Sequence, residues 1–385
     1  MQRSATPAAE YLHTISSRIE GIKRDVPKLA AMAQQMAGHL LSGGNIFVPP
    51  VSPYWASEFT ARAGGLMGIA TGDYAGPYVP TSRDDVAFTT LPRKWSEKSQ
   101  AGWRALTESP ARIFVIGDDR PAKALGGRVE ARTGLGEGST EQANIRTFEE
   151  LVRGWIVTGE MIAACTRAGK MPHIWMSVWL EGALVRNASF FAHDNLREPW
   201  KVPLFHERIY VPPIQAGHVA DEFLTELEKI RSLLRRQTEA LDAASRWVSQ
   251  AKRAGRKVSM VAVGHAYPEI LEADENELPV SWSKSISNVS RAHPDDLAEG
   301  DVAIHFGYSP VEAEHVAGLL ARKVKFVYTS PYGQRDLQQH ENLIWLDLPW
   351  RPGDGTVDVP GYSVRILPMS SSAHTMAYFA VLAGL

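Results

Sequence analysis

Apolar residues recur at three- and four-residue steps in two long stretches, which predicts two long amphipathic helices. The first covers residues 8–42, contains Pro27, a residue that kinks helices, and is ended by Gly43 and Gly44. The second covers residues 218–254, and a shorter helix is expected over residues 372–382 at the end of the chain. Short apolar runs after the long helices are typical of buried strands.

These runs place strands between the helices in both halves of the chain. Residues 71–109 are rich in Gly, Pro, Ser and Thr and are expected to form loop with some irregular helix. Strands that alternate with helices predict parallel sheets covered by helices on both faces. The strands are expected at residues 46–48, 111–117, 173–180, 208–211, 257–263, 301–306, 325–328, 343–348 and 364–367.

The order of elements repeats along the chain, which indicates a tandem duplication. Each half opens with a long helix, followed by a glycine turn and a strand. A similar segment closes each half, Arg208–Pro212 in the first and Arg365–Pro368 in the second. We therefore expect two α/β sandwiches of one type, residues 1–216 and residues 217–385.

Composition excludes several classes of protein. The 385 residues carry 41 Lys and Arg against 43 Asp and Glu, a formal net charge of −2, which disfavours a nucleic-acid-binding surface. The single cysteine, Cys165, cannot form an internal disulfide and is expected to be buried. No apolar window is long enough to span a membrane, and the first residues do not resemble a secretory signal. We expect a cytoplasmic protein.

Hydroxyl side chains gather where strands of the second half end. Ser309 follows one predicted strand, Thr329 and Ser330 end the next, and Ser371 and Ser372 open the last helix. Free N–H groups and hydroxyls at a helix N-terminus bind anions, and the carboxyl ends of parallel strands meet at one edge of a sheet. Each turn taken alone is more typical of helix capping, since Ser and Thr are preferred caps. Together they favour a phosphate site.

The first half differs at the corresponding place. Its second predicted strand ends in Gly117-Asp118-Asp119, where two carboxylates would repel a phosphate. We therefore expect that the site of the first domain is degenerate or serves another ligand.

Several motifs resemble the phosphosugar-binding branch of the sugar isomerase (SIS) domain family, in their order and spacing more than in any single motif. The resemblance implies a flavodoxin-like three-layer α/β/α sandwich for each half, a sugar phosphate as ligand, and pairing into a homodimer. The segments that carry it are Gly43–Val48, Ser52, Glu58, Arg62–Gly65, Gly264–His265, Asp301–Ser309, Val327–Ser330 and Leu367–Ser372.

Aldose–ketose isomerisation needs a base that moves a proton between adjacent carbons. The isomerases of this family place a Glu shortly before the Ser/Thr turn of the last helix, where this chain has Arg365-Ile366-Leu367. Glu58 and His265 are the substitute candidates. Two purely structural alternatives stay open: Glu58 pairs with Arg62 one helical turn away, and His265 is an ordinary loop histidine. Further substrate contacts are expected from Ser52, Gly264 and His374.

The sequence therefore favours a phosphosugar-binding protein, formally an isomerase of sugar phosphates, whose phosphate is held by Ser309, Thr329, Ser330, Ser371 and Ser372. A non-catalytic sensor or scaffold with a decayed site is the alternative, and the missing family Glu favours it. A different α/β enzyme, with its site between the domains, is a third possibility. No metal-ligand spacing and no dinucleotide-binding fingerprint is present, so no metal or cofactor is expected.

Overall fold

The computed structural model describes residues 6–49, 51–71, 82–92, 95–117, 129–135, 142–190, 203–263, 281–282, 295–307, 311–330 and 340–385. The chain forms two compact units, and neither is contiguous in the sequence. The first-sheet unit consists of Arg18–Glu226 and Pro352–Met369. The second-sheet unit consists of Met1–Ser17, Leu227–Arg351 and Ser370–Leu385.

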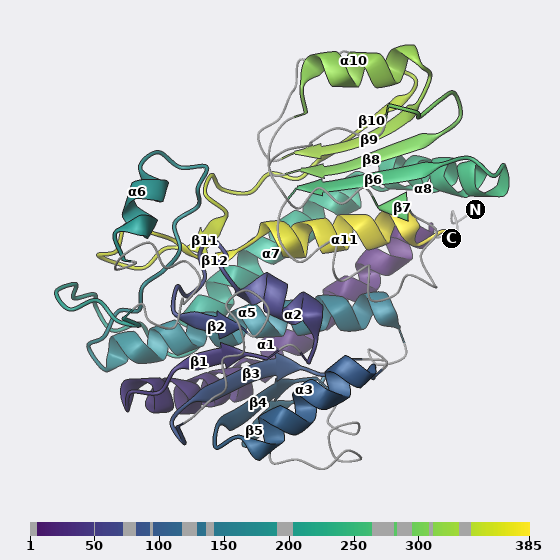
Figure 1. The fold of residues 1–385 in the computed structure, drawn as a ribbon. Coiled ribbons are helices and arrows are strands. Elements are labelled where there is room, and N and C mark those ends of the chain that lie inside the picture. The colour runs from purple at the N-terminus through teal and green to yellow at the C-terminus, as the bar shows by residue number, and fades with distance from the viewer. Residues whose placement is uncertain are drawn as a thin grey trace. The chain divides into compact units, whose positions relative to one another are not determined.

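The first-sheet unit contains a parallel sheet of five strands in the order β2-β1-β3-β4-β5. Helix α3 covers one face, where Trp103 and Leu106 pack on Phe47, Ala87 and Ile113 (Figure 1). The bounds are β1 Ile46–Val48, β2 Ile69–Thr71, β3 Val86–Thr90, β4 Arg112–Ile116, β5 Ala131–Thr133, α2 Pro53–Phe59, α3 Glu97–Glu108 and α5 Ala143–Arg167.

Helices α2 and α5 meet β3 of this sheet through a run of aromatic rings. Trp55 and Phe59 of α2 both lie edge-on to Phe88, and Phe59 also packs against Trp155 of α5 at a centroid distance of 4.4 Å. Trp55 donates its indole N–H to the carbonyl of Phe88 at 3.2 Å, which satisfies its only polar atom. Burial of these large side chains fixes α2 beside the sheet.

The second-sheet unit repeats this architecture with the strand order β10-β9-β8-β6-β7. Helices α10 and α8 lie on opposite faces of its sheet, and α11 packs on α8 (Figure 1). The bounds are β6 Val258–Val263, β7 Ser281–Trp282, β8 Val302–Gly307, β9 Lys325–Ser330, β10 Leu343–Asp347, α8 Thr238–Arg253, α10 Ala313–Ala321 and α11 Ser370–Leu382.

The two sheets share one topology. Numbered along the chain within each unit, the strands of both lie in the order 2-1-3-4-5. This is the flavodoxin-like order, in which ligands bind beyond the carboxyl ends of the strands where the order reverses. That point lies between β1 and β3 in the first sheet and between β6 and β8 in the second.

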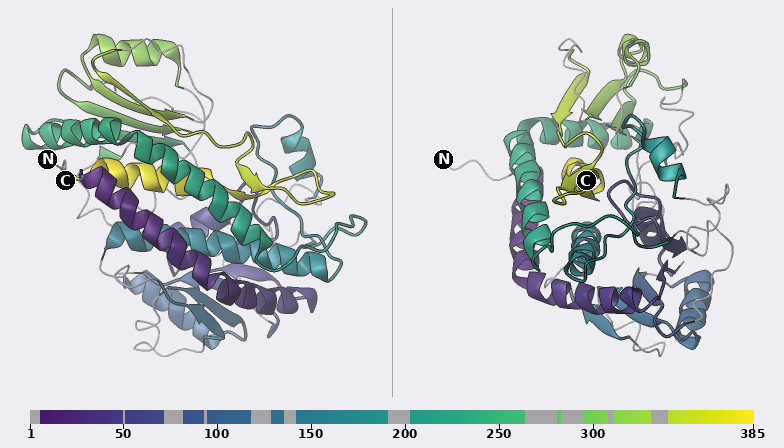
Figure 2. Two further views of the ribbon diagram at one scale, coloured as in Figure 1. Left: turned by 180° about the vertical axis from the view of Figure 1, so that it is seen from behind. Right: turned by 90° about the vertical axis from the view of Figure 1, so that its left-hand side faces the viewer.

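The predicted long helices are present, with one correction. Helix α1 spans Pro7–Leu41 with Pro27 inside it and bends along its length (Figure 2), as helices do at an internal proline. The second long helix is two helices, α7 His218–Arg236 and α8, separated at Gln237. The Gln237 side chain accepts from the backbone N–H of Asp347 at 2.7 Å and donates to its carbonyl at 2.9 Å. Both hydrogen bonds lie at the break between the two helices.

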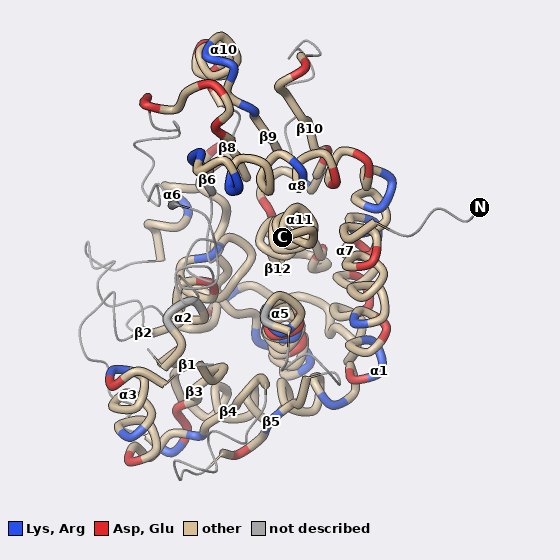
Figure 3. The backbone as a smooth tube through the Cα atoms, turned by 90° about the vertical axis from the view of Figure 1, so that its right-hand side faces the viewer, with Lys and Arg blue, Asp and Glu red and all other residues tan. Residues whose placement is uncertain are grey.

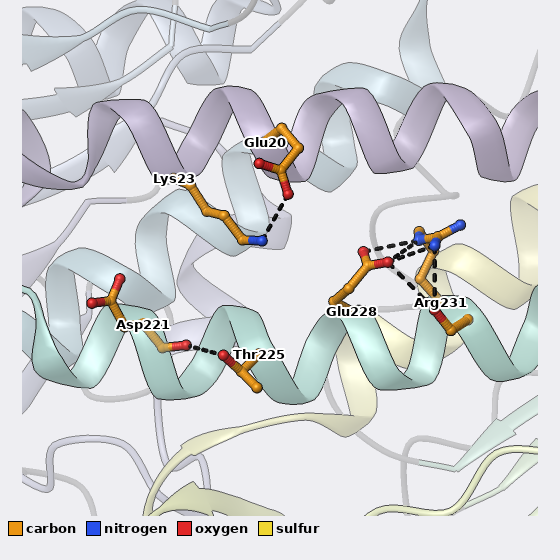
Figure 4. Close-up of polar contacts among 7 residues, drawn as sticks. Glu20, Lys23, Asp221, Thr225, Glu228 and Arg231 are labelled. Carbon is orange, nitrogen blue, oxygen red and sulfur yellow. Dashed lines mark hydrogen bonds and ion pairs between the residues drawn. The ribbon is translucent and has the colours of Figure 1, made fainter.

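Short-range polar contacts support the surfaces of these helices. Figure 4 shows the Glu20–Lys23 pair on α1, at 2.7 Å, and on α7 the Glu228–Arg231 pair and the Thr225 hydroxyl that donates to the carbonyl of Asp221. Figure 3 shows both signs of charge along α1, α5 and α7. The exposed Glu20–Lys23 pair contributes only about 0.2–0.5 kcal/mol.

Four further segments differ from the sequence-based prediction. Residues 71–109 contain the regular elements β3 and α3 rather than irregular structure. Residues 173–180 and 208–211 form no strand; the first carries only an isolated bridge at Ile174 and is followed by helix α6, Ala183–Ala188. The last predicted strand is β12, Ile366–Pro368, which pairs antiparallel with β11, Gly355–Val357, outside both parallel sheets.

Two further predictions concern the burial of Cys165 and the lack of a membrane-spanning helix. Cys165 is buried in α5, as predicted, and burial raises the pKa of its thiol to about 12, so it is a packing residue. No helix among the described residues has the length and apolar character needed to cross a bilayer.

Candidate functional site

Three hydroxyl groups are buried at the carboxyl edge of the first sheet. Ser52 follows β1, Thr90 is the last residue of β3, and Thr133 is the last residue of β5. Their exposures are 0%, 0% and 5%, and no hydroxyl of the three has a hydrogen-bond partner within the described part of the chain. A buried hydroxyl without a partner costs about 1–3 kcal/mol, so such atoms point to a polar group that completes them.

A buried ion pair of α5 lies near one of these hydroxyls, that of Thr90. Arg146 of α5 donates from Nε to Glu150 Oε1 at 2.7 Å, and from its terminal Nη2 to the carbonyl of Leu91, directly after β3. Gly117 follows β4 with a φ of +121°, and a Cβ at this position would lie 3.0 Å from Glu150 Oε1 and 3.4 Å from Thr90 Oγ1. Thr90 and Glu150 therefore both approach the same glycine. We call Ser52, Thr90, Thr133, Arg146 and Glu150 the first-sheet cluster.

The second-sheet unit places another group of polar residues at the start of α11. Ser370, Ser371 and Ser372 open the helix and are buried, and Ser372 Oγ has no hydrogen-bond partner among the described residues. His374 is also buried and lies edge-on to Phe306 of β8 and to Trp350, at centroid distances of 5.7 and 4.9 Å. The N-terminus of α11 thus lies beside the carboxyl end of β8, as the anion-site prediction requires.

Of the other predicted phosphate ligands, Thr329 alone has a side chain that the structure describes. Thr329 is fully buried, and its hydroxyl donates to the carbonyl of His305 at 3.3 Å, so it ties β9 to β8. Ser330 ends β9, and its side chain is not described. Ser309, Gly264 and His265 lie outside the described residues, as do Asp118 and Asp119.

Glu58, the predicted base, is part of a buried network. Its Oε1 accepts from the indole N–H of Trp155 at 2.7 Å and lies 3.8 Å from Arg62 Nε. Arg62 Nη2 in turn lies 3.1 Å from Asp354 Oδ2, and all three charged residues are at most 3% exposed. The structure brings Glu58 together with Arg62, and does not present it at the surface.

Sequence reasoning missed Thr90, Thr133, Arg146 and Glu150. The run Val86–Thr90 was available as a signal, because an apolar segment that ends in two threonines resembles the hydroxyl-ended strands of the second half. Its glycine- and proline-rich surroundings led to a loop prediction. Strand β3, not β4, is the counterpart of β8, since each is third in its sheet. The Gly117-Asp118-Asp119 segment therefore corresponds to the end of β9.

Among the described residues there is no group of three or more His, Cys, Asp or Glu side chains arranged to hold a metal ion.

Comparison with solved structures finds the same fold elsewhere. The C-terminal domain of glucosamine-fructose-6-phosphate aminotransferase from Francisella tularensis matches with a TM-score of 0.53 at 10% identity, over 99% of this chain and 95% of that one. The chain has the SIS fold. The prediction of two flavodoxin-like α/β sandwiches with parallel sheets is thereby confirmed.

Two other solved structures match the SIS fold of this chain less closely. A proposed sugar-binding protein from Salmonella typhimurium has a TM-score of 0.45 at 11% identity, over 95% of this chain and 98% of that one. A proposed phosphosugar isomerase from Silicibacter pomeroyi has a TM-score of 0.43 at 10% identity, over 98% and 96%. No protein-family model matches the chain, and no curated protein sequence does.

Proposed function

We propose that this protein binds a sugar phosphate at the carboxyl edge of its first sheet. The observation that carries the proposal is the set of three buried, unpartnered hydroxyls of Ser52, Thr90 and Thr133, at the strand ends where this topology binds ligands. Arg146 supplies a guanidinium, the side chain best suited to phosphate. The Francisella structure of the same fold is named for an enzyme that acts on a sugar phosphate, which supports the ligand class.

The second-sheet unit is proposed to hold a site of its own for such a ligand. Ser371, Ser372 and His374 at the start of α11 are its described members. Ser309, Thr329, Ser330, Gly264 and His265 complete the set predicted from the sequence. A degenerate first domain was also predicted, but the first-sheet cluster argues for a site there. The domain border at residue 217, the duplication, the homodimer and the cytoplasmic location stay proposals.

Isomerisation of the sugar is the less favoured form of this function. Glu58 accepts from Trp155 and faces Arg62 in the core, and Glu150 accepts from Arg146, so neither carboxylate is placed as an open base. His265 is the other predicted base. The engagement of Glu58 favours the alternative, a sensor or scaffold that binds the phosphosugar without turnover.

Calorimetric titration with hexose and amino-sugar phosphates tests the proposal. One of them is expected to bind the parent protein, and Thr90→Val and Ser52→Ala are each expected to weaken that binding at least about tenfold. Thr158→Val is the matched control, because its hydroxyl is buried in α5 and donates to the Gly154 carbonyl at 3.0 Å, outside the cluster. Equal affinity in all four proteins would refute the site.

Turnover is measured separately. An isomerase exchanges the C2 proton of its sugar phosphate with solvent deuterium, whereas a sensor binds without exchange. Binding without exchange is the expected result.

A further inference from the structure

Four polar side chains meet in the first-sheet unit outside its strands and outside the first-sheet cluster. The imidazoles of His173 and His206 lie edge-on with centroids 3.9 Å apart. His206 Nε2 lies 2.9 Å from the hydroxyl of Tyr362, and Arg186 Nη2 donates to that hydroxyl at 2.8 Å. We call these four residues the histidine cluster. Three of them lie within residues 173–206, and Tyr362 lies 156 residues after His206.

The hydrogen bonds assign the protons of the neutral cluster. The carbonyl of Pro203 can only accept, so His173 carries its proton on Nδ1 and leaves Nε2 bare. Tyr362 accepts from Arg186, which leaves its own proton available to His206 Nε2, and in this arrangement the proton of His206 lies on Nδ1. Neither His206 Nδ1 nor His173 Nε2 has a hydrogen-bond partner in the part of the chain that is described.

The charge of this cluster is positive and unbalanced. Burial, then His173 and Arg186, lower the pKa of His206 to about 4, and burial is also the main cause that lowers the pKa of His173. Burial raises the pKa of the Tyr362 phenol. No carboxylate of the described residues contributes to any of these shifts. Two imidazoles, a guanidinium and a phenol thus face one another, and the described residues supply no acidic partner.

Aromatic rings fix the guanidinium in place. The Arg186 carbon Cζ lies 5.1 Å from the ring centroid of Phe190 and 5.8 Å from that of Tyr362. Arg186 also donates from Nη1 to the carbonyl of Ile174 at 2.9 Å, so its orientation is set before any ligand arrives. His173 and His206 are 6% and 9% exposed, and in such surroundings an ionic hydrogen bond is stronger than in water.

We propose that the histidine cluster is a binding site for an oxyanion. The anion is held by Arg186 and by the Nδ1–H of His206, and the bare Nε2 of His173 becomes a further donor once it takes up a proton. Binding is therefore coupled to protonation: the anion raises the pKa of both imidazoles, and affinity increases as the pH falls from neutral toward the pKa of His206. This site shares no residue with the first-sheet cluster.

Sulfate is the probe, because its charge does not change over this pH range. The imidazole resonances of the parent protein are titrated by NMR with and without sulfate, and sulfate affinity is measured at about pH 5.5 and about pH 7.5, on either side of the usual histidine pKa. We expect sulfate to raise the pKa of His173 and His206 and to bind at least about tenfold more tightly at the lower pH.

Two variants with a matched control separate this site from general salt effects. Arg186→Gln and His206→Gln are each expected to weaken sulfate binding at least about tenfold. Arg208→Gln removes an exposed arginine that lies two residues from His206 and outside the cluster, and it is expected to bind like the parent. Unchanged imidazole pKa values in sulfate, or equal binding by all three variants, would overturn the proposal. Inorganic phosphate in place of sulfate then tests whether the site takes phosphate as well.

The experiments test the oxyanion site and the sugar-phosphate site independently of each other. Loss of sulfate binding in Arg186→Gln with normal sugar-phosphate binding supports both sites, and loss of sugar-phosphate binding in Thr90→Val leaves the sulfate result untouched. An effect of Thr90→Val on sulfate binding would contradict the assignment to the histidine cluster.

Discussion

Arg62 and Asp354 form a buried ion pair, with Nη2 and Oδ2 3.1 Å apart and side-chain exposures of 3% and 1%. Arg62 follows α2, whereas Asp354 lies almost 300 residues later in the segment Pro352–Met369. The Asp354 carboxylate also accepts from the backbone N–H of Met369 at 3.1 Å. The pair therefore holds a late segment of the chain in the first-sheet unit.

Removal of one partner of this pair is expected to be strongly destabilising. Asp354→Asn removes one of the two carboxylates beside the buried Arg62 guanidinium and leaves Glu58, at 3.8 Å, to balance its charge. Removal of one partner of a buried ion pair costs about 3–5 kcal/mol. Urea unfolding measures the change. Arg365→Gln is the control, because its partner Asp358 is exposed and the pair, at 2.7 Å, contributes at most about 1 kcal/mol. Equal losses in the two variants would contradict the role given to Arg62 and Asp354.

Replacement of the Thr90 hydroxyl is expected to stabilise the ligand-free protein. The side chain is fully buried without a described partner, and Val has nearly the same shape without the polar atom. Thr90→Val is therefore expected to raise the free energy of unfolding by about 1 kcal/mol, within the cost of an unsatisfied hydroxyl. Thr158→Val breaks a hydrogen bond instead and is expected to lower it. A loss of stability in Thr90→Val would mean that the hydroxyl has a partner in the folded protein.

Two glycines of helices are expected to respond oppositely to alanine. A Cβ on Gly154 of α5 would lie 2.4 Å from Trp55 Cη2 and 2.6 Å from Phe59 Cζ, so Gly154→Ala is expected to cost about 1–3 kcal/mol through overpacking. Gly38 of α1 has nothing within 4 Å of that position, and Gly38→Ala is expected to stabilise by up to about 1 kcal/mol. Thermal unfolding compares the two. Stabilisation by both would show that α2 packs less closely on α5 than described.

The stability of the protein is expected to fall in acid partly through His206. Its pKa is lowered from 6.5 to about 4, so above the higher value it is neutral in both folded and unfolded chains. Between these two values the unfolded chain binds the proton and the folded chain does not, so the free energy of unfolding decreases as the pH falls. Below the lower value both forms bind it and this contribution stops changing.

Urea unfolding at a series of pH values, without sulfate or phosphate, measures this effect. His206→Gln lacks the titrating group and is expected to show a shallower decline over that window than the parent. His218→Gln is the control, because His218 is half exposed in its pair with Glu222 and outside the cluster. The prediction fails if both variants follow the parent curve.

The periodicity of apolar residues was sufficient to predict α1, α11 and most of the central strands. Leu12, Ile15 and Ile19 are fully buried on one face of α1, as their spacing requires. The apolar runs at β4, β8 and β9 are long enough to be recognised without their partners. Three-residue strands such as β2 and β5 are too short to carry a periodic signal. Strand β12 was predicted, but no local pattern indicated its antiparallel pairing with β11.

The roles of the polar residues depended on neighbours that are distant in sequence. The i, i+4 spacing predicted the meeting of Glu58 with Arg62, but Trp155 and Asp354 lie beyond any local pattern. Thr90 reads as an ordinary loop residue until β3 is placed between β1 and β4. The histidine cluster joins residues 173, 186, 206 and 362, and no motif in the sequence connects them.

The sequence by itself determined the class of fold. Buried strands alternate with amphipathic helices, and a parallel sheet covered by helices buries both the strands and the apolar faces of the helices. Tertiary structure alone decided the strand order 2-1-3-4-5, the division into two non-contiguous units and the surroundings of each polar group. The physical reason is the sequence separation between the residues that set each feature. Helix and strand periodicity are set within a few residues, whereas strand pairing, burial of charge and convergence of side chains are set by segments that meet only when the chain has folded.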